Sequence, residues 1–195
     1  MIPHSGKRLF ISGIPTSGKS YLAQLLAKTV NGTAILLDNY RESLSKNDMY
    51  KKWTDFYLDQ DEATYLNNTS PDDQWANLVV QSEGLWPAFL KEIDRYRTET
   101  KPIIFECVNM LPHLVKKDLN FPGVVLIGSS LEETLRRNQR DPRWGDTPTL
   151  QYLEAKYFFY VERPRYQTEA QKYGYMVFET ADEAVKYCLD LLTSN

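Results

Sequence analysis

The chain has 195 residues, of which 42% are hydrophobic and 25% charged, a composition typical of one folded domain and not of a disordered chain. The formal net charge of -3 argues against a nucleic-acid partner, because binding along a polyanion needs an excess of Lys and Arg. No apolar run approaches the roughly 20 residues that span a bilayer, and residues 1–6 lack the apolar stretch of an export signal. We therefore expect a cytoplasmic protein with no membrane or nucleic-acid partner, in which Cys107 and Cys188 are buried thiols.

Five short apolar runs predict buried parallel strands, because they are rich in β-branched residues and do not alternate with polar ones. Helical patterns separate these runs through the length of the chain. The alternation predicts an α/β domain of three layers with right-handed crossovers. The predicted strands cover residues 8–12, 34–37, 103–108, 124–128 and 175–178.

Helix boundaries are marked by capping residues. Ser70, followed by a proline and two acids, predicts the start of a helix whose apolar stripe is interrupted at Gly84 and Pro87. We expect a kink at that interruption. Ser130 and Thr180 each stand three residues before a Glu, which is the spacing of a capping box.

The segment 38–73 departs from the alternation of strands and helices. It is polar and aromatic, and it holds nine acidic residues against four basic ones. We expect it to form an insertion over the sheet edge within a single domain that spans residues 1–195.

The loop after the first predicted strand carries the most specific motif. It reads Gly13-Ile14-Pro15-Thr16-Ser17-Gly18-Lys19-Ser20 and matches G-x-x-x-x-G-K-[ST] between a strand and a helix. Glycines let such a loop turn around a phosphate, and the amides of the loop and helix start point at the anion. The lysine reaches the β- and γ-phosphates and the serine hydroxyl holds Mg²⁺. The residues expected to bind the nucleotide are Gly13, Thr16, Ser17, Gly18, Lys19, Ser20 and Tyr21.

On this motif and the order of its elements, the chain resembles the P-loop NTPase superfamily. Its short length is similar to that of the small-molecule and nucleotide kinases, such as shikimate kinase, chloramphenicol phosphotransferase, adenylate kinase and 2-phosphoglycerate kinase. The resemblance implies a five-stranded parallel sheet in the order 2-3-1-4-5, ATP and Mg²⁺ as cofactors, an acceptor site between strands two and three, and a short lid.

Asp38 ends the second predicted strand, at the edge where open α/β sheets bind ligands. Related kinases carry an acid here that contacts the acceptor hydroxyl, so it would take the proton or orient the group. A loop Asp that caps the next segment is the alternative. The residues expected to bind the acceptor are Asp38, Tyr40, Arg41 and Asn109.

Glu106 lies within the apolar run of the third predicted strand, where a lone carboxylate is costly. The run resembles a Glu-containing strand of 2-phosphoglycerate kinase and zeta-toxin relatives. A contact with Mg²⁺ through water would compensate the charge, and a structural ion pair is the alternative.

Arginines gather after the fourth predicted strand. Arg136 and Arg140 are four residues apart and share a helix face, and Arg143 follows in a short turn. The run resembles the lid of these kinases, here residues 136–147, whose arginines stabilise the phosphoryl group during transfer. A solvated helix end is the alternative. With Lys19 and Asp38, these arginines are the expected catalytic residues.

These observations predict an ATP-dependent kinase that phosphorylates a hydroxyl of a small molecule. A nucleoside monophosphate kinase is the first alternative, although it needs cations on the acceptor side that the acidic insertion scarcely offers. A regulatory protein that binds ATP or GTP is the second. The sequence identifies neither the acceptor nor the oligomeric state.

Overall fold

The computed structural model describes residues 6–194, and residues 1–5, on which the expectation about an export signal depends, lie outside that range. Within the described residues, five parallel strands form one sheet in the order β2-β3-β1-β4-β5. The α/β fold and the strand order 2-3-1-4-5 are thus confirmed. The strands are β1 (Arg8–Gly13), β2 (Thr33–Leu36), β3 (Ile103–Glu106), β4 (Gly123–Leu126) and β5 (Met176–Phe178).

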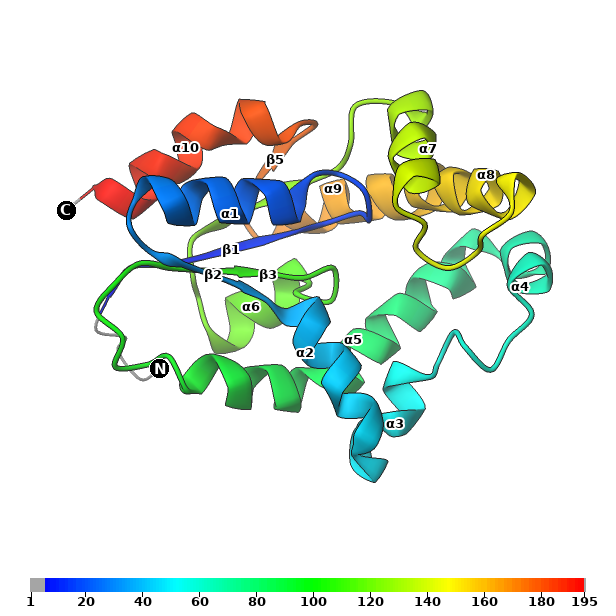
Figure 1. The fold of residues 1–195 in the computed structure, drawn as a ribbon, viewed down its shortest axis with the longest axis horizontal. Coiled ribbons are helices and arrows are strands. Elements are labelled where there is room, and N and C mark those ends of the chain that lie inside the picture. The colour runs from blue at the N-terminus through cyan, green and yellow to red at the C-terminus, as the bar shows by residue number, and fades with distance from the viewer. Residues whose placement is uncertain (1–5, 195) are drawn as a thin grey trace.

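Helices cover both faces of the sheet, with α1 and α10 on one side and α5 and α6 on the other (Figure 1). Between residues 6 and 194, none of them combines the length and apolar character that crossing a membrane requires. The α-helices are α1 (Lys19–Thr29), α2 (Leu37–Ser43), α3 (Asp48–Thr54), α4 (Glu62–Asn68), α5 (Pro71–Asp94), α6 (Pro112–Asp118), α7 (Leu131–Arg140), α8 (Pro148–Lys156), α9 (Arg163–Lys172) and α10 (Ala181–Thr193), and η1 (Leu44–Lys46) and η2 (Tyr157–Glu162) are a 3₁₀- and a π-helix.

Two hydrophobic cores lie on the two faces of the sheet. Leu9 and Ile11 of β1 pack with α1 and α10, whereas Phe10 between them packs with α5, α6 and α9. Successive side chains of a strand point to opposite faces, so a run that is apolar at every position serves both cores. Cys107 and Cys188 are buried free thiols, as predicted.

The strands end earlier than their apolar runs. β2 ends at Leu36, and Leu37 already begins α2, while β3 ends before Cys107. Both Leu37 and Cys107 are nevertheless fully buried. The apolar pattern reports burial, and burial continues after strand pairing has stopped.

α5 is one continuous helix, and Figure 1 shows it changing direction about halfway along, as the kink prediction requires. The side chain of Ser70 caps its start by accepting from the backbone N–H of Asp73. Gly84 has a packing role, because a Cβ there would lie 2.2 Å from the ring of Trp53 in α3. The glycine therefore lets the insertion pack closely on α5.

The two predicted capping boxes differ. Thr180 and Glu183 form the complete box at α10. Ser130 caps α7 by accepting from the backbone N–H of Glu133, but the Glu133 side chain instead pairs with Arg136 and Arg137. Only half of the second box forms, because neighbouring guanidinium groups offer the carboxylate a stronger partner.

Candidate active site

The segment between β1 and α1 forms a tight loop, called here the phosphate loop (residues 13–20). Gly13 has φ 123°, and a Cβ there would lie 1.9 Å from the carbonyl oxygen of Leu126. Gly18 has φ 96° and precedes α1 without a side-chain cap. The first N–H groups of α1 thus have no capping side chain and can bind an anion.

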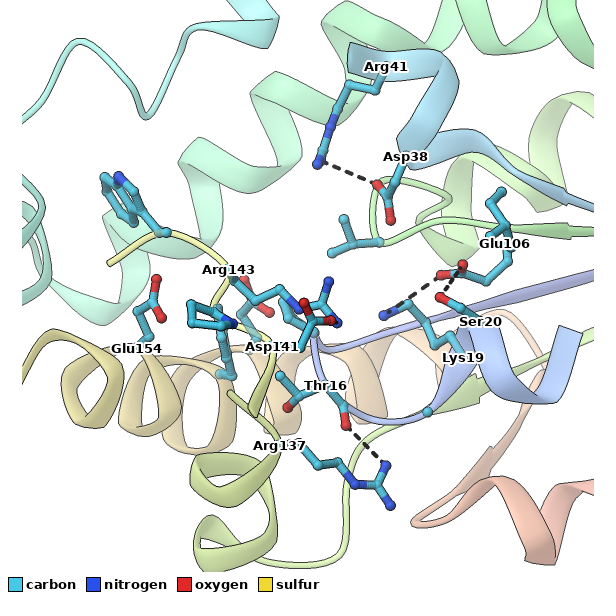
Figure 2. A pocket seen from close by; sticks show the side chains of 18 of the residues that line it. Thr16, Lys19, Ser20, Asp38, Arg41, Glu106, Arg137, Asp141, Arg143 and Glu154 are labelled. Carbon is cyan, nitrogen blue, oxygen red and sulfur yellow. Dashed lines mark hydrogen bonds and ion pairs between the residues drawn. The ribbon is translucent and has the colours of Figure 1, made fainter. Parts of the chain in front are cut away.

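Three polar side chains meet beside this loop (Figure 2). Lys19 is 7% exposed, and its Nζ donates to the carbonyl of Ile14 at 2.8 Å and lies 3.9 Å from Glu106 Oε1. Ser20 Oγ donates to Glu106 Oε2 at 2.9 Å. Burial raises the pKa of Glu106, and the charge of Lys19 opposes that shift.

Glu106 and Ser20 have the chemistry of a magnesium site. Glu106 Oε1 is buried without a hydrogen-bond partner among residues 6–194. Hydroxyl and carboxylate oxygens suit Mg²⁺, which usually keeps several waters and takes others from phosphate. Within the described chain, no three His, Cys, Asp or Glu side chains gather to hold a metal alone. Ser20 and Glu106 would supply two oxygen ligands to an ion that also binds phosphate and water.

A cavity of about 1070 Å³ opens over the phosphate loop. Of the residues expected to bind the nucleotide, Thr16, Gly18, Lys19, Ser20 and Tyr21 line it. Gly13 and Ser17 are buried residues of the loop that do not line the cavity, and Ser17 Oγ donates to the carbonyl of Ile14 at 2.8 Å. These two residues support the conformation of the loop.

Asp38 lies across the cavity from the phosphate loop, in the first turn of α2 and not at a strand end (Figure 2). Its Oδ1 accepts from the Cys107 thiol at 3.2 Å and lies 3.4 Å from Arg41 Nη1. Arg41 also lines the cavity, and its Nη1 donates to Asn109 Oδ1 at 2.9 Å. Asp38 and Arg41 share a helix face because they are three residues apart.

Two residues predicted to bind the acceptor do not line this cavity. Tyr40 packs toward Phe89, with 6.5 Å between ring centroids. Asn109 is fully buried and donates to Ser82 Oγ at 2.9 Å, so it holds Arg41 from behind. The helical twist of α2, which begins at Leu37, turns Tyr40 away from the face that carries Asp38. An acceptor-binding role for Tyr40 and Asn109 stays a prediction.

The predicted lid arginines belong to α7 and to the segment that follows it. Arg136, Arg140 and Arg143 all line the cavity, and Arg143 pairs with Asp141 at 3.0 Å. The Arg136 side chain is 61% exposed and donates twice to Glu133. The hydrogen bond from Arg136, aided by Arg137, lowers the pKa of Glu133 to about 2.

Arg137, which the sequence reasoning did not select, contacts the phosphate loop directly. Its Nη1 donates to the carbonyl of Thr16 at 3.1 Å (Figure 2). Thr134 and Asn138 are the buried positions of α7, so residue 137, three after Thr134, turns toward the loop. The spacing of the buried positions along α7 could have identified Arg137 from the sequence.

No family model and no curated protein matches the chain. Among solved structures, it is similar to a shikimate kinase from Acinetobacter baumannii in complex with shikimate, at 14% identity over 98% of this chain and 96% of that one, with a TM-score of 0.55. A shikimate kinase from Bacteroides thetaiotaomicron matches at 15% identity over 95% and 98%, with a TM-score of 0.53. The chain has a P-loop kinase-type fold. Identity this low establishes the fold and does not extend to the acceptor.

Aromatic rings and acidic side chains form a further wall of the cavity, called here the aromatic wall. The rings of Tyr57 and Trp144 lie 5.5 Å apart, and Tyr157 and Glu162 of η2 line the same space. Sequence analysis did not select any of these residues. An acid beside an apolar run is costly to bury, so Glu162, which follows the aromatic run 157–160 and Val161, was a usable signal.

Two acidic side chains, Glu62 of α4 and Glu154 of α8, lie close together where the insertion packs against the helix that follows the predicted lid. Glu154 is fully buried, and its carboxylate accepts from the Gly145 N–H at 3.0 Å and from Asn138 Nδ2 at 2.5 Å. Burial and the neighbouring Glu154 raise the pKa of Glu62 to about 7. These carboxyl groups, distant in sequence, contact each other only through the packing of α4 against α8.

Proposed function

We propose that this protein is an ATP-dependent phosphotransferase that moves the γ-phosphoryl group of ATP to a hydroxyl of a small molecule. The observation that carries the proposal is one cavity with the phosphate loop at one side and Asp38 at the other. A protein that only binds a nucleotide needs the loop, whereas a kinase also needs a group that positions an acceptor hydroxyl.

The phosphates would rest on the uncapped start of α1 and on Lys19, which exchanges its bond to the Ile14 carbonyl for a phosphate oxygen. Ser20 and Glu106 would hold Mg²⁺, which when bound neutralises charge on the phosphate oxygens. The carboxylate of Glu106 would bind the ion through water.

In the transfer itself, the acceptor oxygen forms a bond to the γ-phosphorus while the bond from that phosphorus to the bridging oxygen breaks. The electron pair of the broken bond stays on ADP, and Asp38 accepts the acceptor's proton. Arg41 and the Cys107 thiol hold Asp38 in place from two sides. Arg140 and Arg143 would stabilise the charge spread over the transferring oxygens.

The proposal treats residues 136–147 as a lid and 38–73 as the acceptor-side insertion of a single domain. It assigns the reaction to the cytoplasm, as expected from the short apolar runs of the sequence, and to a small molecule, because the net charge argues against a nucleic-acid partner. A nucleoside monophosphate kinase is less well supported, because Arg41 is already engaged by Asp38 and Asn109.

The test is an assay of ADP formation with hydroxylated metabolites, sugars, nucleosides and nucleoside monophosphates, beside calorimetry of ATP with Mg²⁺. We expect acceptor-dependent ADP formation by the natural chain. The Lys19→Ala, Ser20→Ala double variant should lose both transfer and ATP affinity. Unchanged ATP affinity in that variant would refute the nucleotide site.

A further inference from the structure

Three buried polar atoms of the aromatic wall have no hydrogen-bond partner among the described residues: Tyr57 Oη, Tyr157 Oη and Glu162 Oε2. All three residues line the cavity, and Glu162 is only 3% exposed. More than about nine in ten buried polar groups in proteins are paired. The three groups also lie close to one another, and the Tyr157 hydroxyl interacts with both Tyr57 and Glu162. The wall therefore offers three neighbouring polar groups to a polar group of a ligand.

The π-helix η2 brings two of these atoms to the same face. Tyr157 and Glu162 are its first and last residues, five positions apart, which is the spacing of one π-helical turn. The Tyr157 hydroxyl lies near the carboxyl group and favours its charged form, but burial prevails and raises the pKa of Glu162 to about 8. Lys19 and Tyr157 are the neighbours that favour the charged form. A cationic partner would stabilise that form further.

The charges on this side of the cavity favour a cation. Asp38, Glu42, Asp55 and Glu162 belong to the insertion and to η2 and line the cavity, and Arg41 is the one basic residue of these two segments that lines it. Arg41 is already paired with Asp38, and Asp55, which follows α3, pairs with Lys51 of that helix. Lys19 is the other cation near Glu162, but the proposed function assigns it to the phosphates of ATP. An acceptor that carries a carboxylate or a phosphate would then meet Glu162 without a cation of its own.

The aromatic rings add a second attraction for a cation. Tyr57, Trp144 and Tyr157 present π-systems around the same space, and ring faces attract ammonium groups. We infer that the phosphoryl acceptor is a small alcohol that also carries a protonated amine. The amine binds Glu162 and the Tyr57 and Tyr157 hydroxyls, while the hydroxyl that receives the phosphoryl group reaches Asp38. This inference rests on the proposed function and narrows its substrate class.

The test uses amino sugars, aminocyclitols and amino alcohols, each assayed beside its N-acetylated form, together with neutral sugars, nucleosides and shikimate. N-acetylation keeps the hydroxyls and removes the charge. We expect transfer to amine-bearing alcohols, with a kcat/KM at least tenfold lower after N-acetylation. Glu162→Gln should lower kcat/KM for the amine-bearing acceptor roughly 10- to 100-fold, through KM, and leave the ATP Kd unchanged.

Glu169→Gln is the matched control, because Glu169 on α9 pairs with His113 and does not line the cavity. It should leave kcat/KM within twofold. Transfer to neutral or acidic alcohols alone, or an unchanged kcat/KM in Glu162→Gln, would overturn this inference and leave the kinase proposal standing. ADP formation with no alcohol at all, despite ATP binding, would count against the kinase proposal itself.

Discussion

Glu62 makes the stability of this protein depend on pH in a direction that can be worked out. The group is 9% exposed, and burial together with the charge of Glu154 raises its pKa from 4.5 to about 7. Between those two pH values the folded chain keeps a proton that the unfolded chain has released. Unfolding therefore releases a proton, and the free energy of unfolding falls as the pH rises.

The size of the effect follows from that shift. At about 1.4 kcal/mol per pKa unit the change corresponds to about 3 kcal/mol, and we expect about 2 kcal/mol because solvent screening reduces the effect for a group that is not fully buried. Glu62→Gln cannot ionise, so it should match the natural chain at pH 4.5 and exceed its stability by about 2 kcal/mol at pH 8.

The measurement is urea unfolding, followed by tryptophan fluorescence, at several pH values from 4.5 to 8. Glu132→Gln, at an exposed position in the first turn of α7, is the control and should show a difference from the natural chain that does not change with pH. A constant difference for Glu62→Gln across the range would refute the reasoning, since only titration of this carboxyl makes the difference grow.

Three further variants test other parts of the site. Asp38→Asn should slow transfer roughly 10²- to 10⁴-fold with ATP affinity intact, and a loss under tenfold in single-turnover kinetics would leave Asp38 only an orienting role. Arg137→Gln loses the guanidinium hydrogen bond to the phosphate loop and should weaken ATP binding about tenfold, as measured by calorimetry. Arg136→Gln should weaken it clearly less, and equal losses of ATP affinity in the two variants would contradict the geometry. Gly84→Ala should lower the free energy of unfolding by about 1 to 3 kcal/mol, and Tm with it, because its Cβ would lie 2.2 Å from the rigid Trp53 ring. A raised Tm would show that the ring moves aside.

Contiguous residues carried enough information to predict the phosphate loop and the alternation of strands and helices. The loop depends on backbone angles that glycine alone adopts easily at Gly13 and Gly18, and those angles are local. Glu106 stood out for the same reason, since an acid inside an apolar run must find a partner wherever the strand lies.

Packing between distant segments decided the rest of the site. Which arginine of α7 meets the phosphate loop depends on helical phase, because adjacent residues differ by about 100° around the axis. Arg137 therefore contacts Thr16, while Arg136 lines the cavity and pairs with Glu133. The π-helical turn that aligns Tyr157 with Glu162 has no marker in the sequence. Side-chain direction is set by such turns and by neighbours far along the chain, whereas a loop motif is set by the residues that compose it.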